Sequence, residues 1–246
     1  MERLNRIVVD SSDSMTDLCV LGAQYPTDKS PYNWAPEREV ARHPYTAIYD
    51  LLFSALRYQP IVLGEVGVYL NMSMHMWRAY FPNAQLYGWD FLPEILDLAK
   101  GHRLHNCYYD KLNMNDIEGV FQAFNKCNTY FDVLIDDSTH AFAHQILFAH
   151  MAYPFLKPGG MLIIEDVFRP WDEKNYEDTL RPLFKYFSSG TFIEANHRNK
   201  FSPGTEIPYY DNDKLLVLFR NQEPAGINPP LVPNPPLIAQ ALADRR

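Results

Sequence analysis

The sequence has few cysteines, and their spacing excludes the usual cysteine-based sites. The three cysteines, Cys19, Cys107 and Cys127, lie far apart and form no CxxC pair. This arrangement indicates neither a zinc site nor a disulfide framework. We therefore expect reduced thiols in a cytoplasmic protein.

Long apolar runs and an excess of positive charge are also missing. No apolar run approaches the roughly 20 residues that span a bilayer, and the segment MERLNRIVVDSSDSM has no apolar core of the kind found in signal peptides. Lysine and arginine number 22 against 30 acidic residues, which gives a net charge of -8. Because an acidic surface repels a phosphate backbone, we expect no nucleic-acid partner. Because long apolar runs are missing, we also expect no membrane partner.

Short apolar runs alternate with helical patterns over most of the 246 residues. This alternation predicts an α/β, Rossmann-like fold with helices on both faces of a mostly parallel, seven-stranded sheet. The expected strands are Pro60–Val66, Gln85–Trp89, Asn106–Tyr109, Phe131–Ile135, Met161–Ile164, Thr191–Ala195 and Lys214–Arg220. The expected helices are His43–Tyr58, Met72–Tyr80, Pro93–Lys100, Asp116–Phe124 and Ala141–Leu156.

Composition divides the chain into three parts. Residues 1–42 are rich in Ser, Asp, Tyr and Pro and do not fit the alternation, so we interpret them as an arm or lid. Residues 43–222 contain the predicted α/β domain. Residues 223–246 include a proline-rich stretch, which predicts an extended tail.

The turn after the first predicted strand indicates an adenosine-containing cofactor. Ligands of open α/β sheets bind beyond the carboxyl ends of the strands, where Glu65 and Gly67 stand. Asp90 ends the next strand and could accept both ribose hydroxyls. The GxGxxG pattern of dinucleotide sites is missing, because Tyr69 and Asn71 follow Gly67. That absence favours a ligand without phosphates, although Gly67 and Asp90 could instead serve only as a turn and a helix cap.

Two further strands end in paired acids. Asp136 and Asp137 follow one strand, and Glu165 and Asp166 follow the other. If these strands are neighbours, their carboxylates converge and repel one another unless a cation or protons neutralise them. A hard cation such as Mg²⁺ suits such oxygen ligands, and His140 could accept a proton beside it. Single acids could alternatively cap the following helix.

Several segments together resemble one branch of the class I S-adenosylmethionine-dependent methyltransferases. The branch is the TylF/MycE type of antibiotic biosynthesis, which includes macrolide sugar O-methyltransferases, and PTDKSPYN at 26–33 also resembles lincosamide N-methyltransferases. The segments are TDK at 27–29, HPY at 43–45, GEVGV at 64–68, MWRAYFPNAQLYGWD at 76–90, IDDSTHAFAHQI at 135–146 and LKPGGMLIIEDV at 156–167. Relatives commonly carry more glycine after the position of Gly67.

The resemblance implies a role for each matching residue. It implies S-adenosylmethionine binding by Glu65, Gly67, Asp90, Asp110 and Asp136, a possible Mg²⁺ site at Asp137, Glu165 and Asp166, and catalysis by His140 with Asp137. We add Tyr25, Asp28, Lys29 and Tyr32 as substrate or lid residues, because the segment before the domain is rich in aromatic and polar groups.

The resulting expectation is methyl transfer to a small natural product. A hydroxyl acceptor is favoured by the acids and His140, and an amine is the close alternative. Two other classes stay open: an NAD-dependent oxidoreductase, which the missing GxGxxG disfavours, and a non-catalytic binding module, which the acid cluster disfavours. We expect a homo-oligomer.

Overall fold

The computed structural model describes residues 1–32, 42–169, 173–198 and 212–222. The strands are β1 (Asn5–Asp10), β2 (Val62–Val66), β3 (Gln85–Asp90), β4 (Cys107–Lys111), β5 (Phe131–Asp136), β6 (Leu156–Ile164), β7 (Phe187–Asn196) and β8 (Lys214–Arg220). The α-helices are α1 (Asp17–Gln24), α2 (Thr46–Phe53), α3 (Met72–Tyr80), α4 (Pro93–Gly101), α5 (Ile117–Lys126), α6 (Phe142–Ala152) and α7 (Glu173–Leu180). Short 3-10 helices cover Ser54–Leu56, Tyr153–Phe155 and Arg181–Tyr186.

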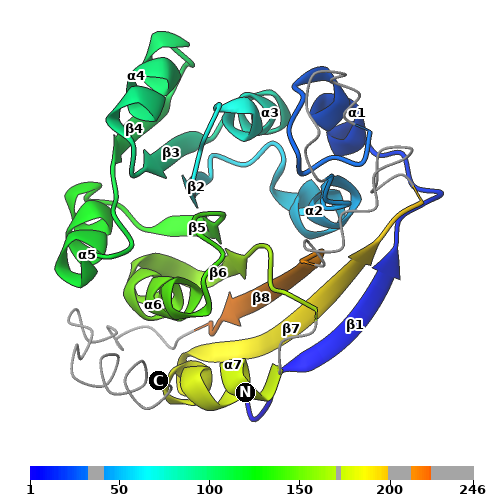
Figure 1. The fold of residues 1–246 in the computed structure, drawn as a ribbon, viewed down its shortest axis with the longest axis vertical. Coiled ribbons are helices and arrows are strands. Elements are labelled where there is room, and N and C mark those ends of the chain that lie inside the picture. The colour runs from blue at the N-terminus through cyan, green and yellow to red at the C-terminus, as the bar shows by residue number, and fades with distance from the viewer. Residues whose placement is uncertain (33–41, 170–172, 199–211, 223–246) are drawn as a thin grey trace.

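The eight strands form one twisted sheet in the order β1-β7-β8-β6-β5-β2-β3-β4 (Figure 1). All neighbours are parallel except β8, which runs antiparallel to β6 and β7. The order reverses between β2 and β5, which are paired directly. A topological switch of this kind opens a crevice beyond the carboxyl ends of the strands.

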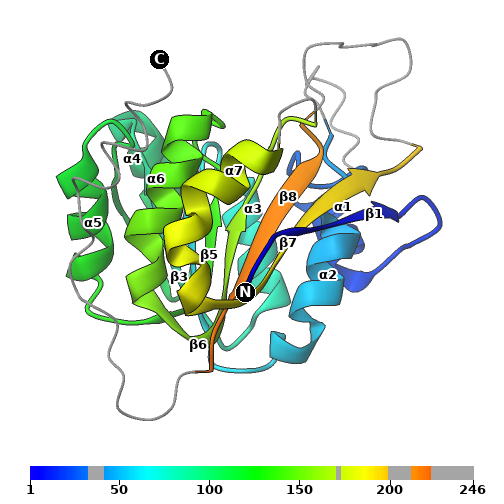
Figure 2. The ribbon, with the colours of Figure 1, turned by 90° about the horizontal axis from the view of Figure 1, so that it is seen from below.

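Helices cover both faces of the sheet, as predicted (Figure 2). One apolar cluster joins the sheet to α1, α2 and α3 and includes Phe53, Trp77 and Ile163. A second cluster joins the opposite face to α5, α6 and α7 and includes Phe124, Phe148 and Ile164. Neighbouring residues of a strand point to opposite faces, so Ile163 and Ile164 belong to different clusters.

The predicted strands all form, but the sheet has eight strands rather than seven. The additional strand is β1, which lies in the segment interpreted as an arm and pairs in parallel with β7. The following helix α1 packs against α2 and α3. Residues 1–32 therefore contribute to the core as well as lying beside the site. The tail predicted for residues 223–246 lies outside the described residues.

No helix in the described part of the chain is long and apolar enough to cross a membrane.

Candidate active site

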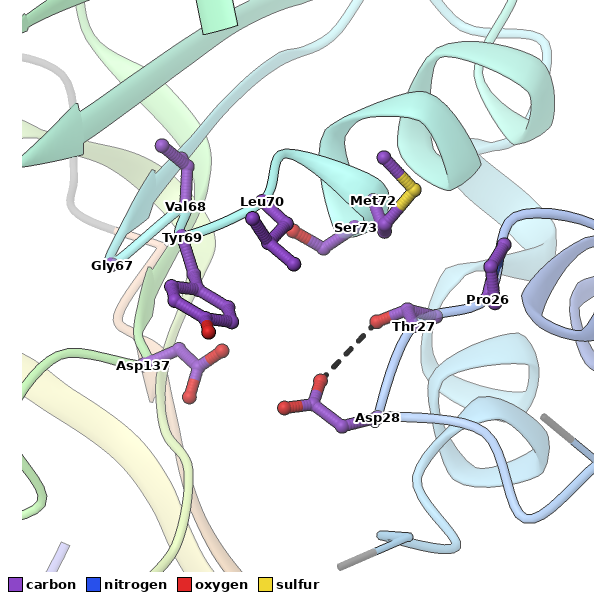
Figure 3. A pocket seen from close by; sticks show the side chains of 10 residues that line it. All are labelled: Pro26, Thr27, Asp28, Gly67, Val68, Tyr69, Leu70, Met72, Ser73 and Asp137. Atoms are coloured by element: carbon purple, nitrogen blue, oxygen red, sulfur yellow. Dashed lines mark hydrogen bonds between the residues drawn. The ribbon is translucent and has the colours of Figure 1, made fainter. Parts of the chain in front are cut away.

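A cleft opens at the switch point, between the turn that follows β2 and the segment that precedes α2. It encloses about 460 Å³ of space, including the part that is open to solvent. Asp28 and Asp137 face each other across it (Figure 3). The lining residues are Pro26, Thr27, Asp28, Gly67, Val68, Tyr69, Leu70, Met72, Ser73 and Asp137. The predicted cofactor turn and the predicted lid segment thus form opposite walls of one cleft.

The turn from β2 to α3 depends on an unusual backbone. Gly67 has a φ of +93°, and a Cβ there would collide with the carbonyl oxygen of Asp137. Tyr69 and Asn71 also have positive φ, of 41° and 68°, although neither is glycine. Residues held in this region cost about 1–3 kcal/mol each and tend to cluster at functional sites. The chain therefore forms this tight turn with Gly67 and with two other residues that adopt positive φ.

Asp90 holds this turn from the end of β3. Its two carboxylate oxygens each accept a hydrogen bond from a backbone amide at 3.1 Å, one from Tyr69 and one from Leu92. Asp110 lies one strand further, opposite Trp89 in register, and its exposed carboxylate is 3.8 Å from the ammonium of Lys126. Neither acid lines the cleft. Their predicted contacts with a cofactor stay predictions.

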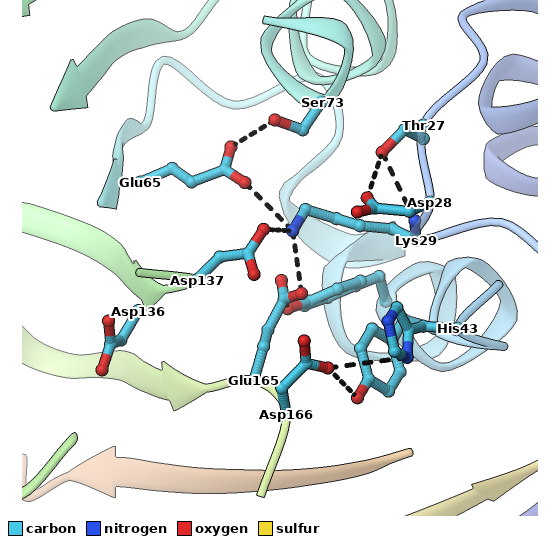
Figure 4. A network of polar contacts seen from close by, with 12 residues as sticks. Thr27, Asp28, Lys29, His43, Glu65, Ser73, Asp136, Asp137, Glu165 and Asp166 are labelled. Atoms are coloured by element: carbon cyan, nitrogen blue, oxygen red, sulfur yellow. Dashed lines mark hydrogen bonds and ion pairs between the residues drawn. The ribbon is translucent and has the colours of Figure 1, made fainter. Parts of the chain in front are cut away.

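Asp136 lies at the end of β5 and points away from the cleft (Figure 4). Its Oδ1 accepts hydrogen bonds from the amide and the hydroxyl of Ser138, at 3.2 and 2.6 Å. Its Oδ2 is buried and has no hydrogen-bond partner among the described residues. Burial raises the pKa of Asp136 to about 7. The structure gives Asp136 a clear role in the turn, whereas its predicted role in cofactor binding stays a prediction.

Three carboxylates converge on the ammonium group of Lys29 (Figure 4). They come from the carboxyl ends of β2, β5 and β6, which lie side by side in the sheet. Lys29 Nζ is 3.1 Å from Glu65 Oε1 and 2.8 Å from Glu165 Oε2, and it also contacts Asp137 Oδ2. The lysine side chain is only 1% exposed. The Lys29 ammonium therefore lies among the carboxylates for which the sequence predicted neutralisation by a cation or by protons.

The charges of this group depend on one another. Burial would lower the pKa of Lys29, but Asp137, Glu165 and Glu65 together raise it well above its ordinary value. Burial raises the pKa of Glu165 to about 7, an effect that Lys29 partly offsets. Burial also raises the pKa of Asp137 well above its ordinary value, and Lys29 partly offsets that effect as well. Lys29 is therefore protonated throughout the physiological range, and its charge favours the ionised forms of Asp137 and Glu165 against the effect of burial.

Asp166 belongs to a second group on the same edge. Its Oδ1 accepts a hydrogen bond from the Tyr45 hydroxyl at 2.7 Å and lies 3.6 Å from His43 Nδ1. His43 also contacts Asp213 at 2.9 Å. Burial would lower the pKa of His43, but Asp166 and Asp213 raise it to about 9. Asp166 Oδ2 is left to face His140 Nε2, at 3.5 Å.

His140 has the environment of a proton acceptor. It lies between β5 and α6 with a positive φ of 58°, and its side chain is about one-third exposed. Burial lowers its pKa, so the imidazole is neutral near pH 7. Nδ1 is buried without a hydrogen-bond partner among the described residues.

The acids divide into two possible cation sites. Asp137 belongs to both, because its oxygens reach Glu65 and Glu165 in one group and His140 and Asp166 in the other. The predicted set of Asp137, Glu165 and Asp166 is thus split, since Glu165 turns toward Lys29 and Asp166 turns toward His140. The second group offers the carboxylates of Asp137 and Asp166, which suit a hard divalent cation, with the imidazole of His140 beside them.

The predicted lid residues have different positions. Tyr25 stacks on His75, with ring centroids 5.6 Å apart. The Tyr32 hydroxyl donates to the carbonyl of Ser14 at 2.8 Å. Neither tyrosine lines the cleft, whereas Asp28 does. Their predicted contact with a substrate stays a prediction.

Three residues that surround the acids lie outside the predicted set of site residues. His43 and Tyr45 contact Asp166, and the Tyr49 hydroxyl donates to Glu165 Oε1. The HPY segment and the spacing of four between Tyr45 and Tyr49 were the available signals, because residues four apart share one face of a helix.

No protein-family model matches the chain, but proteins of known function are similar to it. It is 29% identical over 175 residues to the 8-demethyl-8-(2-methoxy-alpha-L-rhamnosyl)-tetracenomycin-C 3'-O-methyltransferase of Streptomyces olivaceus. The matched segment covers 68% of this chain and 41% of that protein. It is 28% identical to the mycinamicin VI 2''-O-methyltransferase of Micromonospora griseorubida, over 61% of this chain and 36% of that protein. The chain thus spans about two-fifths of the length of these curated relatives.

Solved structures agree with the fold. The MycE methyltransferase of the mycinamycin biosynthetic pathway, in complex with Mg and SAH, superposes with a TM-score of 0.60 at 22% identity, over 87% of this chain and 57% of that one. The complex of the same protein with Mg, SAH and mycinamycin VI gives a TM-score of 0.54 over 86% of this chain and 57% of that one. In sequence and in fold, the chain is therefore similar to the sugar O-methyltransferases of antibiotic biosynthesis.

Proposed function

We propose that this chain transfers a methyl group from S-adenosylmethionine to a hydroxyl of a sugar on a small natural product. The observation that carries the proposal is the position of the Asp137–His140–Asp166 group, which stands at the switch point beside the cleft. The similarity to sugar O-methyltransferases supports it, as does the turn around Gly67. The predicted set of cofactor residues, Glu65, Gly67, Asp90, Asp110 and Asp136, is part of this proposal.

The residues of the chain provide binding, orientation and proton transfer. When bound, S-adenosylmethionine supplies an electrophilic methyl group, and a divalent cation would favour loss of the acceptor hydroxyl proton. Asp137 and Asp166 would hold that cation, with Glu165 behind them on Lys29. His140 accepts the proton as the acceptor oxygen bonds to the methyl carbon and the carbon–sulfur bond breaks. The electron pair of that bond stays on sulfur, so S-adenosylhomocysteine leaves without the positive charge.

Neutral His140 suits this role because a base must be unprotonated at the operating pH. The lowered pKa of its imidazole meets that requirement. A neutral amine acceptor would need neither the acids nor this base to the same degree. The acids and the neutral imidazole of His140 therefore favour oxygen over nitrogen as the acceptor atom.

Two further expectations accompany the proposal. The acceptor is a small molecule, and the chain works as a homo-oligomer in the cytoplasm. Three free cysteines are consistent with a reducing compartment.

The test combines binding with product analysis. Isothermal titration should detect binding of S-adenosylhomocysteine, and mass spectrometry should detect addition of one methyl group to glycosylated antibiotic precursors incubated with the chain, S-adenosylmethionine and Mg²⁺. A chain that binds neither S-adenosylmethionine nor S-adenosylhomocysteine would exclude the proposed function. Binding with methylation only of amino-sugar nitrogen would move the proposal to N-methylation.

A further inference from the structure

The acidic and basic side chains that line the cleft are of one kind. Among the described lining residues these are Asp28 and Asp137, and no lysine, arginine or histidine is present. Behind this lining stand Glu65 and Glu165, which contact the ammonium of Lys29 together with Asp137. The cleft therefore favours a ligand with positive charge.

Asp28 is the acid that Lys29 leaves available. Lys29 contacts Glu65, Asp137 and Glu165 directly, whereas Asp28 has no ion pair within 4.0 Å among the described residues. The Asp28 carboxylate accepts one long hydrogen bond, from the Thr27 hydroxyl at 3.4 Å. Most of its capacity to accept hydrogen bonds or to balance a charge is thus directed into the cleft.

The position of Asp28 is fixed by its neighbours. Its carbonyl accepts a hydrogen bond from the amide of His43 at 2.7 Å. The carbonyl of Lys29 accepts from the amides of Tyr45 and Thr46, at 3.1 and 3.2 Å. Because the Lys29 side chain is also buried among the acids, the segment is held at both the backbone and the side chain. A carboxylate placed this rigidly can recognise a charge at a defined position.

We propose that Asp28 recognises the sulfonium centre of S-adenosylmethionine and so distinguishes the cofactor from its neutral-sulfur product. The inference rests on the proposed function and adds a residue that determines specificity. The methyl group must point toward Asp137 and His140 to be transferred, and Asp28 stands across the cleft from Asp137 (Figure 3). Transfer removes the sulfonium charge, so the attraction to Asp28 ends with the reaction and favours product release.

S-adenosylmethionine, without an acceptor, and S-adenosylhomocysteine are suitable probes because they differ in charge at the sulfur. S-adenosylmethionine carries a sulfonium, and S-adenosylhomocysteine has a neutral sulfur. We expect calorimetry to show that the wild-type chain binds S-adenosylmethionine about tenfold more tightly, the scale of a hydrogen bond to a charged group. Asp28→Asn should lower S-adenosylmethionine affinity by about tenfold and S-adenosylhomocysteine affinity by less than about threefold.

The controls separate charge at the site from net charge and from folding. Asp97→Asn removes one exposed acid on α4 and should leave both affinities unchanged. Asp28→Ser offers a second variant if the asparagine protein does not fold, and circular dichroism checks both. Equal loss for both ligands in the Asp28 variants, or no preference for S-adenosylmethionine in the wild type, would overturn the inference. Failure of the wild type to bind either ligand would instead exclude the proposed function.

Discussion

At the scale of single residues, Lys29 shows what the sequence could and could not reveal. The paired acids predicted a need for a cation, and the sequence suggested Mg²⁺. The structure places the Lys29 ammonium among three of the acids, 108 residues before Asp137 and 136 before Glu165. No local pattern distinguishes a lysine that will be buried from one on the surface, because burial depends on where distant strands end.

The ion pairs of Lys29 give a prediction for stability. Lys29→Met leaves Glu65, Asp137 and Glu165 buried without a counter-ion, so we expect a loss of about 3–5 kcal/mol in the free energy of unfolding. Lys157→Met is the matched control, since Lys157 pairs with Asp132 at 2.7 Å but is 38% exposed, and it should cost about 0–1 kcal/mol. Urea denaturation measures both. Similar losses in the two variants would contradict the role of Lys29.

Asp136 gives a prediction for pH dependence. Its pKa in the folded chain is about 7, above the ordinary value of 3.8. The folded state therefore holds a proton that the unfolded state releases between about pH 4 and 7, so this group makes the chain less stable as pH rises through that window. Asp136→Asn should be more stable than wild type at pH 8 by about 1–4 kcal/mol, since one pKa unit corresponds to about 1.4 kcal/mol.

The same variant also tests the predicted binding role of Asp136. Thermal unfolding at pH 3 should show little difference from wild type, because the carboxyl is then largely protonated in both the folded and the unfolded state. Calorimetry with S-adenosylhomocysteine should show a clear loss of affinity only if Asp136 contacts the cofactor. A variant that is less stable than wild type at pH 8 would show that the carboxylate is needed in its charged form.

At the scale of elements, apolar runs located seven strands and missed β1. Six of the seven have buried positions that appear in the sequence as apolar runs, whereas β4, at the other edge of the sheet, has none and gave only a weak signal before the next predicted helix. Strand β1 is an edge strand, and five of its six residues are exposed, so its sequence NRIVVD has no buried face to signal. Residues 1–32 include β1, α1 and Lys29, so their deletion should lower stability as well as remove part of the segment interpreted as an arm.

The turn between β2 and α3 was located from the sequence, and its geometry makes a sharp prediction. Gly67→Ala puts a Cβ against the Asp137 carbonyl at positive φ. We expect the free energy of unfolding to fall by more than about 1–3 kcal/mol, which is the cost of such backbone strain alone. We also expect the variant to lose binding of S-adenosylhomocysteine. Gly101→Ala, at the end of α4, is the control, because nothing lies within 4 Å of its Cβ. It should leave stability and binding nearly unchanged. Normal binding by the Gly67 variant would remove this turn from the cofactor site.

At the scale of the whole molecule, the candidate site is assembled from three neighbouring strands in the middle of the sheet and from the segment that leads into α2. The acids come from β2, β5 and β6, while Lys29, His43 and Tyr45 come from the segment before and at the start of α2. The sequence could predict that strand ends meet, because parallel strands share one edge. It could not predict how the acids divide between two groups, since that depends on side-chain directions set by the surrounding helices.

This division decides what removal of a metal should do. If Asp137 and Asp166 hold the cation beside His140, EDTA should suppress methylation and added Mg²⁺ should restore it. Asp166→Asn should then weaken Mn²⁺ binding, measured by electron paramagnetic resonance, much more than Glu165→Gln does, because Glu165 is directed to Lys29.

His140→Ala should lower kcat by ~10²–10⁴, the range for a lost general base, while leaving S-adenosylhomocysteine affinity unchanged. If EDTA has no effect while His140→Ala still fails, the acids serve to orient His140 and the substrate, and the reaction proceeds without a metal.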